Sequence, residues 1–266
     1  LFQSNGKGTF IEVPQPALKN LGIITDAQWM DYNGDEWPDL VVVGEWMSIR
    51  VFLNFKGIFS EVIPKGLEKT RGLWNVLEIA DVDGDGKEDL IAGNIGENNF
   101  FEEGMKMFVS DFDSNGSAEQ IICFKRGEAF VPVLDKDELI AQIPALKKNM
   151  VYYEDYGKRS ISEILGEARI NSALQMEIDS RKTTVFLRKD EGFEAIAIPL
   201  EAQYSSVYAI QVSDVNEDGA ADVLFGGNQY NVKPQFGRHD ASSGLLVLGS
   251  LNKGMLEFKK KIFLNV

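Results

Sequence analysis

A nine-residue acidic motif occurs four times in this chain, and no other feature constrains the fold as strongly. Each copy has Asp, Asn or Glu at positions 1, 3, 5 and 9, and the copies span 31–39, 81–89, 111–119 and 214–222. Oxygen side chains at this spacing suit a hard cation such as calcium, which takes six to eight oxygen ligands at about 2.3–2.6 Å. Carboxylates packed this closely repel one another unless a cation lies between them. The repeat therefore predicts up to four bound calcium ions.

The predicted ligands are the side-chain oxygens at positions 1, 3, 5 and 9 and the backbone carbonyl at position 7. They are Asp31, Asn33, Asp35, Trp37 and Asp39; Asp81, Asp83, Asp85, Lys87 and Asp89; Asp111, Asp113, Asn115, Ser117 and Glu119; and Asp214, Asn216, Asp218, Ala220 and Asp222. Glycine at position 6 permits a sharp turn in three loops, whereas the first loop has Glu36 there and Gly34 two positions earlier. The first loop departs most from the pattern.

The acidity of the chain is concentrated in these loops. The net charge is −14, from 41 acidic residues and 27 Lys and Arg, and thirteen of the acids occupy ligand positions. Without those thirteen the chain is close to neutral. A generally acidic, solvating surface is therefore not expected, and a basic footprint for nucleic acid is also absent from the sequence.

The residues beside each loop predict a β-hairpin and exclude an EF-hand. Strand-like runs precede the loops at 75–80, 107–110 and 207–212, and others follow at 40–44, 90–93 and 223–227. An EF-hand requires a bidentate Glu at position 12 that opens a helix. Position 12 is apolar here in every copy: Val42, Ala92, Ile122 and Phe225.

Further strand–turn–strand units, at 1–10 and 51–59, predict two hairpins per repeat and thus a four-stranded sheet. We therefore expect an all-β fold: a β-propeller of four-stranded blades, with about four to five blades present over a single domain 1–266 and belonging to a larger propeller. The loops start 50, 30 and 103 residues apart. The short interval leaves too little chain for a full blade, so either one blade is abbreviated or its outer strands come from elsewhere in the chain.

Residues 135–180 have a helical pattern and are expected to form an insertion within one blade. Apolar residues recur at helical spacing from Asp135 onwards, and Ser160 with Glu163 forms a capping box that starts a helix. Such an insertion either covers an edge as a lid or presents a partner-binding surface.

The run 81–93 (DVDGDGKEDLIAG) together with 1–10 (LFQSNGKGTF) resembles the FG-GAP/VCBS repeats, the calcium-loop β-propellers of integrin α subunits and many bacterial surface proteins. The segments 93–98, 142–148 and 226–242 are similar to large VCBS-repeat proteins of Bacteroidetes, which often pair the propeller with an ASPIC/UnbV domain. The resemblance implies calcium in all four loops, with Glu119 in place of the usual Asp and Glu36 in place of the usual Gly. It also implies further blades or an ASPIC/UnbV domain in the parent chain.

The connection 226–242 is the strongest candidate for a ligand loop outside the metal sites. It gathers an aromatic side chain, amides and charges suited to a sugar or peptide: Asn228, Tyr230, Lys233, Arg238, His239 and Asp240. The alternative is a long, ordered loop held by its own hydrogen bonds. Trp46 and Trp74 are expected to pack between blades, and Cys123, the single cysteine, to be a small buried apolar residue.

The sequence predicts no catalytic residues. The conspicuous carboxylates belong to the calcium loops, and His239, the single histidine, lies beside Asp240 in sequence, which does not give the oriented pair of a triad. The expected function is a calcium-binding interaction or adhesion module that binds a protein or glycan, with calcium as a structural clip. The alternative is a carbohydrate-binding or carbohydrate-active protein that uses the propeller face and the 226–242 loop.

Millimolar calcium is found outside cells, so an extracellular, cell-surface or periplasmic location is expected, although no signal peptide opens the sequence given. The longest apolar runs are too short to span a bilayer.

Overall fold

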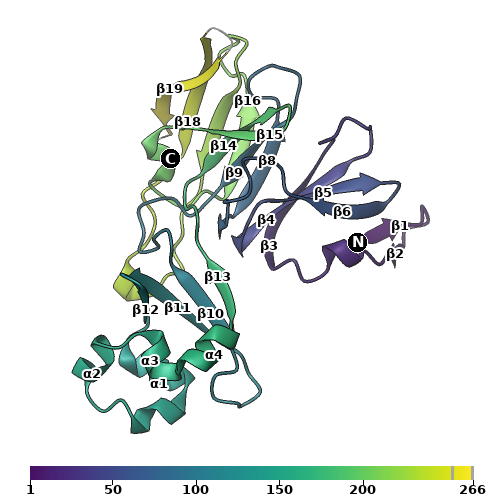
Figure 1. Ribbon diagram of the computed structural model, residues 1–266. Coiled ribbons are helices and arrows are strands. Elements are labelled where there is room, and N and C mark those ends of the chain that lie inside the picture. Colours follow the sequence, from purple (N-terminus) through teal and green to yellow (C-terminus); the bar gives the residue numbers. More distant parts are fainter. Residues whose placement is uncertain (253–254, 265–266) are drawn as a thin grey trace. The chain divides into compact units, whose positions relative to one another are not determined.

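A computed structural model describes residues 1–252 and 255–264 (Figure 1). The chain forms two compact units. The first unit combines Leu1–Phe100 with Ser180–Val266, and the second unit, Phe101–Asp179, is inserted between them. In the described part of the chain, no helix has the length and apolar character needed to cross a membrane.

The first unit contains three sheets, each with four strands in a row whose neighbours are antiparallel, and one of them has a fifth, short strand. Sheet 1 consists of β3 (Ile23–Met30), β4 (Asp39–Met47), β5 (Arg50–Phe55) and β6 (Ile58–Val62), with β7 (Gly72–Leu73) paired to β4. Sheet 2 consists of β8 (Val76–Ala80), β9 (Asp89–Gly93), β14 (Thr184–Lys189) and β15 (Gly192–Ile196). Sheet 3 consists of β16 (Ala209–Ser213), β17 (Asp222–Gly226), β18 (Leu245–Asn252) and β19 (Met255–Phe263). The prediction of an all-β, propeller-like fold built from four-stranded sheets is confirmed.

Shorter elements complete this unit. They are the hairpin β1 (Phe2–Ser4) and β2 (Phe10–Glu12), and the 3₁₀ turns η1 (Pro16–Leu18), η3 (Leu200–Gln203) and η4 (Pro234–Phe236).

Every acidic loop connects the first two strands of its sheet. The loops at 31–39, 81–89 and 214–222 join β3 to β4, β8 to β9 and β16 to β17. Because the strands of each sheet alternate in direction, the connection from the second to the third strand lies at the opposite end of the strands from the acidic loop. Those second connections differ greatly in length: they cover residues 48–49, 94–183 and 227–244.

Sheet 2 explains the irregular spacing of the loops. Its first two strands, β8 and β9, precede the inserted unit, whereas its last two strands, β14 and β15, follow it, and β9 pairs with β14 from Thr184↔Ala92 to Phe186↔Leu90. The remaining strands of this sheet therefore come from elsewhere in the chain, as one of the two explanations of the 30-residue interval requires. The third acidic loop belongs to the inserted unit and not to sheet 2.

The core of the first unit lies on both faces of sheet 2. On β9, Leu90 and Ala92 pack with residues of sheet 1, whereas Ile91 packs with residues of sheet 3. Successive side chains of a strand point to opposite faces, so a strand covered on both faces is apolar throughout. Trp74 is fully buried between sheets 1 and 2, 6.3 Å from the ring of Phe186, in agreement with its predicted packing role.

The second unit combines a sheet with helices. The sheet runs in the order β12-β11-β10-β13, with strands Ala129–Pro132, Glu119–Arg126, Lys106–Ser110 and Leu174–Glu177. The helices are α1 (Lys136–Gln142), η2 (Pro144–Lys148), α2 (Tyr153–Gly157), α3 (Ile161–Leu165) and α4 (Glu167–Ser172). They lie within the predicted 135–180 segment, and Ser160 with Glu163 forms the predicted capping box at the start of α3.

This unit extends beyond the predicted helical insertion because the helices need an apolar surface to cover. Leu139, Ile161 and Leu165 pack against Phe108 and Ile121 of the sheet that carries the third acidic loop. Cys123 is buried in the same cluster, as predicted, and burial raises the pKa of its thiol to about 12, which makes it unreactive.

The boundaries of the inserted unit give a direct test of its independence. We expect that replacing residues 101–179 with a four-residue Gly-Ser linker leaves the first unit folded, because the Gly96 N–H donates to the Arg181 carbonyl at 2.9 Å and holds the ends together. The far-UV circular dichroism should lose its helical component. The melting temperature should move by only about 5 °C, the equivalent of about 1–2 kcal/mol.

The matched control removes residues 184–196 instead. That deletion uncovers β9 on the side of sheet 2 that β14 occupies and should abolish cooperative unfolding. Equal damage from the two deletions would contradict the division of the chain at Phe101 and Asp179.

Candidate metal centres

The acidic loops share one pattern of internal hydrogen bonds. In the second loop, the two carboxylate oxygens of Asp81 accept from the backbone N–H groups of Gly84 and Gly86 at 2.8 and 2.9 Å, and Asp85 accepts from Lys87 N–H at 2.8 Å. The corresponding donors to position 1 are Gly34 and Glu36 for Asp31, Asn115 and Gly116 for Asp111, and Asp218 and Gly219 for Asp214. Each loop therefore wraps around its first carboxylate.

Position 6 shows how the first loop keeps this shape without glycine. Gly86, Gly116 and Gly219 have φ of +85°, +90° and +86°, a left-handed conformation that glycine adopts readily. Glu36 adopts the same conformation with φ of +68°, which costs a residue with a Cβ about 1–2 kcal/mol. The first loop thus follows the common turn at an energetic cost.

The ninth-position carboxylate is buried, and in the first unit it joins its own strand to the acidic loop and to the third strand of the sheet. In sheet 2, the oxygens of Asp89 accept from the N–H groups of Val82 in the loop, at 2.9 Å, and Arg188 in the third strand, at 2.6 Å. Asp39 does the same with Tyr32 and Asn54, and Asp222 with Val215 and Gly249. In the second unit, Glu119 accepts from Phe112 N–H at 2.8 Å. We call this contact the ninth-position staple.

Burial makes two of these carboxylates, Asp39 and Asp89, harder to ionise. Burial raises the pKa of Asp89 to about 6 in spite of its two backbone hydrogen bonds, and repulsion from Asp83 and Asp85 adds to the effect. The pKa of Asp39 is raised for the same main reason, loss of solvation. A cation beside these groups would offset both the loss of solvation and the mutual repulsion.

Two loops bring three carboxylates close enough to share one ion. Ligand oxygens of Asp81, Asp83 and Asp89 all lie within 4.8 Å of one another, and so do those of Asp111, Asp113 and Glu119. Two oxygens that each lie 2.3–2.6 Å from one calcium ion are separated by at most about 5 Å. The donor sets of the second and third loops therefore fit calcium.

The first and fourth loops have an amide at position 3, and it binds within the loop. Asn33 Nδ2 donates to Asp35 Oδ2, and Asn216 Nδ2 donates to Asp218 Oδ2, both at 2.9 Å. Both loops still place oxygens at positions 1, 5 and 9 around the same turn. Their amide oxygens accept from the backbone N–H of position 5 at 3.0 Å.

The lysines near the second loop have distinct partners. Lys87 Nζ donates to Asp190 Oδ1 at 2.7 Å, so its side chain is engaged outside the loop and position 7 offers only its carbonyl as a ligand. This hydrogen bond raises the pKa of Lys87 and lowers that of Asp190. Lys189 Nζ lies 3.3 Å from Asp83 Oδ2 and partly neutralises the second loop.

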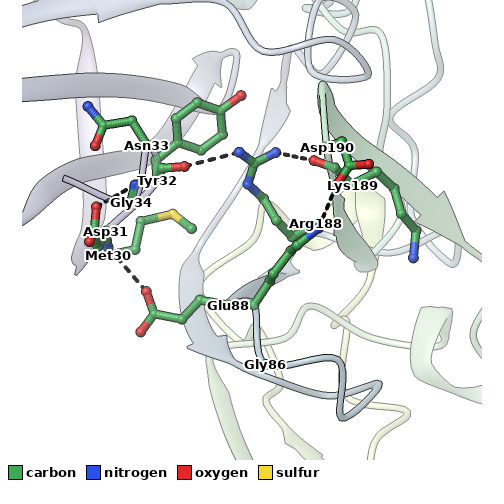
Figure 2. Close-up of a pocket in the computed structure, with 11 residues that line it drawn as sticks. Met30, Asp31, Tyr32, Asn33, Gly34, Gly86, Glu88, Arg188, Lys189 and Asp190 are labelled. Carbon is green, nitrogen blue, oxygen red and sulfur yellow. Dashed lines mark hydrogen bonds and ion pairs between the residues drawn. The ribbon is translucent and has the colours of Figure 1, made fainter. Parts of the chain in front are cut away.

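Residues from the first and second loops and from the β14–β15 turn line a cavity of about 480 Å³ (Figure 2). Arg188 crosses between the two loops: its guanidinium donates to the Tyr32 carbonyl at 3.0 Å and lies 4.0 Å from the centre of the Tyr32 ring. Glu88 Oε2 accepts from Asp31 N–H at 3.2 Å. The sequence reading missed Arg188, because the only local signal is one arginine at the end of a strand run.

The predicted ligand loop is largely engaged with itself. Asn228 donates to the Ser242 carbonyl at 2.8 Å and accepts from Ser242 N–H and Ser205 Oγ, both at 3.0 Å. His239 is 3% exposed, and its backbone pairs with Gln229 in both directions. The remaining members of this loop lie at the surface: Tyr230, Lys233, and the ion pair of Arg238 with Asp240 at 3.4 Å. The loop has the internal bonding expected of an ordered connection.

Comparison with known families identifies one repeat. A family model described as an FG-GAP-like repeat matches residues 31–92, which run from the first acidic loop through β9. The chain therefore contains an FG-GAP repeat, and the predicted resemblance is confirmed for this segment. No curated protein matches the chain.

The ninth-position staple can be tested without metal. Replacing Asp222 with Ala leaves the N–H groups of Val215 and Gly249 without their acceptor, so in EDTA we expect a loss of about 2–4 kcal/mol in the free energy of unfolding by urea. Asp218→Ala removes an exposed carboxylate from the same loop and should cost less than about 1 kcal/mol. Similar losses in the two variants would argue against a structural role for position 9.

His239 gives a second, pH-dependent test. Burial lowers the pKa of His239 below its usual 6.5, and its Nε2 has no hydrogen-bond partner among the described residues. The unfolded state therefore takes up a proton before the folded state does, and this contribution to stability is lost as the pH falls below 6.5. In EDTA, His239→Phe should reduce the slope of unfolding free energy against pH, by at most about 1.4 kcal/mol per pH unit. An unchanged slope would show that His239 titrates normally.

Proposed function

We propose that this chain, in which residues 31–92 form an FG-GAP repeat, is a calcium-stabilised, non-catalytic interaction module that works outside the cytoplasm, at the cell surface or in the periplasm. Calcium is the structural clip of its hairpins, and the partner is a protein or a glycan. The observation that carries the proposal is the convergence of the Asp81, Asp83 and Asp89 carboxylates in a loop whose pattern occurs four times.

The proposed role of the ion is thermodynamic. Calcium that binds only the folded loop stabilises the fold by RT ln(1 + [Ca²⁺]/Kd), or about 2.7 kcal/mol per site at one hundred times Kd. Extracellular modules bind calcium with Kd of about 10⁻⁴–10⁻³ M. Sites of this strength fill in millimolar calcium, which supports a location outside the cytoplasm.

A non-catalytic role is supported by the engagement of the reactive groups. The carboxylates that cluster are those of the metal loops, and each first-position acid is held by backbone N–H groups. His239 is buried in the 227–244 connection, where burial lowers its pKa and disfavours the charged form. A general acid or base requires a group that faces substrate, and His239 does not meet that requirement.

The residues that bind the proposed partner are best sought at the end of the strands opposite the acidic loops. The connections 48–49, 94–183 and 227–244 lie at that end of their sheets, and their length differs from sheet to sheet. Functional residues are concentrated in such variable connections, whereas the repeated scaffold positions them. Further blades and an ASPIC/UnbV domain remain predictions.

Calcium dependence is the central test of this proposal. We expect EDTA to lower the melting temperature and calcium to restore it, with magnesium a poor substitute because it demands octahedral geometry at shorter distances. In 10 mM calcium, Asp81→Asn should lose most of the stabilisation that the second loop contributes. Asn33→Ala should lose less, because the second loop has the larger set of carboxylates.

Glu194→Gln is the matched control, since Glu194 is an exposed acid on β15 of the same sheet and lies outside the predicted ligand set. Its calcium-dependent shift should equal that of the wild type. Identical melting curves for wild-type protein in EDTA and in calcium would defeat the structural-clip proposal.

A further inference from the structure

Two bridges join the first and second acidic loops, one direct and one through Arg188 of β14, and Figure 2 shows the contacts of Glu88 with Asp31 and of Arg188 with Tyr32. Glu88, at position 8 of the second loop, accepts the backbone N–H of Asp31, at position 1 of the first. Arg188 forms the other bridge. We call the four residues Asp31, Tyr32, Glu88 and Arg188 the interloop clasp. Each loop is thus bonded to the other at a residue that adjoins or supplies a predicted metal ligand.

Arg188 contacts both loops through different parts of the same residue. Its backbone N–H donates to Asp89 Oδ1, the ninth-position ligand of the second loop, at 2.6 Å. Its guanidinium donates to the Tyr32 carbonyl at 3.0 Å and to the Gly192 carbonyl at 2.9 Å, and it stacks on the Tyr32 ring. The Arg188 side chain is therefore held at several points, and the same residue contacts Asp89 and Tyr32.

We propose that the interloop clasp couples the first two metal sites, so that an ion in one loop raises the affinity of the other. Arg188 and Glu88 are positioning residues in this coupling and contribute no ligand atom. The inference rests on the proposed calcium binding.

The direction of the coupling follows from order. An ion in the second loop fixes Asp89, and Asp89 in turn fixes the backbone of Arg188. A fixed Arg188 holds Tyr32, whose own N–H donates to Asp39 Oδ2 in the first loop at 3.0 Å. The second ion to bind then orders fewer groups and pays less conformational entropy. By linkage, the effect is equal in both directions.

The fourth loop provides an internal comparison. It lies in the same compact unit and has the same internal pattern, but its ninth-position acid bonds to its own sheet, at Val215 and Gly249. Asp218 in this loop is the counterpart of Asp85 in the second loop, since each accepts the N–H of position 7.

Trp37 makes the first loop observable by itself. It occupies position 7 of that loop and is 40% exposed, so excitation of tryptophan should sensitise the luminescence of terbium(III), a calcium surrogate, bound there. The Trp37→Phe variant identifies the part of the signal that belongs to this loop. Titration of the full chain with terbium then measures the affinity of the first loop in each variant.

The experiment is a double-mutant cycle. In the wild-type background, Asp85→Ala in the second loop should weaken terbium binding at the first loop at least about fivefold, the lower end of typical coupling. Asp218→Ala in the fourth loop should change it by less than about twofold. In the Arg188→Lys background, which keeps the charge but not the planar fork, Asp85→Ala should have little effect.

General destabilisation by Arg188→Lys would shift both terbium affinities and leave their ratio unchanged, so the ratio isolates coupling. Glu88→Ala tests the other bridge at an exposed side chain and should reduce the same ratio. The inference is overturned if Asp85→Ala has no effect in the wild type, or if its effect persists in both the Arg188→Lys and the Glu88→Ala backgrounds. Failure of terbium and calcium to bind any loop would instead overturn the proposed function.

Discussion

The buried ninth-position carboxylate is the contact on which the sheets of the first unit depend. Asp39, Asp89 and Asp222 each accept one N–H from their loop and one from the third strand of their sheet. A buried ionised group requires compensation by hydrogen bonds or an opposite charge, and the raised pKa of Asp89 shows that two backbone donors compensate only in part. The same residue that joins the loop, the second strand and the third strand therefore favours a cation nearby. The side chain that holds the sheet together is thus also a predicted metal ligand.

The staple also explains how sheet 2 accepts a large insertion. The third strand of that sheet, β14, is held by two contacts: the Arg188 N–H donates to Asp89, and residues 184–186 pair with β9. Neither contact requires β14 to follow β9 directly in the chain. The cost of closing a longer loop grows only slowly with its length, so an inserted unit with its own apolar core adds little penalty. The cluster of Leu139, Ile161 and Phe108 supplies that core.

Local patterns predicted the loops and their hairpins because the ligand spacing and the flanking strands lie within a few residues of one another. The capping box at Ser160 and the burial of Trp74 and Cys123 were predicted for the same reason. Local patterns could not predict the partners of the staple. Asp89 bonds to Arg188, which follows the inserted unit in the sequence, and nothing near Arg188 in sequence indicates that pairing. The inclusion of the third acidic loop in the inserted unit was missed likewise, because a hairpin signal does not identify the sheet that the hairpin joins.

The connections at the two ends of each sheet differ in how much they vary. At one end of the strands, the acidic loops keep one length and one bonding pattern, as expected of a metal site, which tolerates little change in ligand spacing. At the other end, the connection from the second to the third strand is a tight turn in sheet 1, a segment that contains the inserted unit in sheet 2 and the 227–244 loop in sheet 3. Residues of the latter two connections bond to two adjacent serines: Ser206 Oγ donates to the Ile95 carbonyl, and Ser205 Oγ donates to the His239 carbonyl. The uniform acidic loops thus stabilise sheets whose second connections are free to vary, since these connections lie at the opposite end of the strands from the loops.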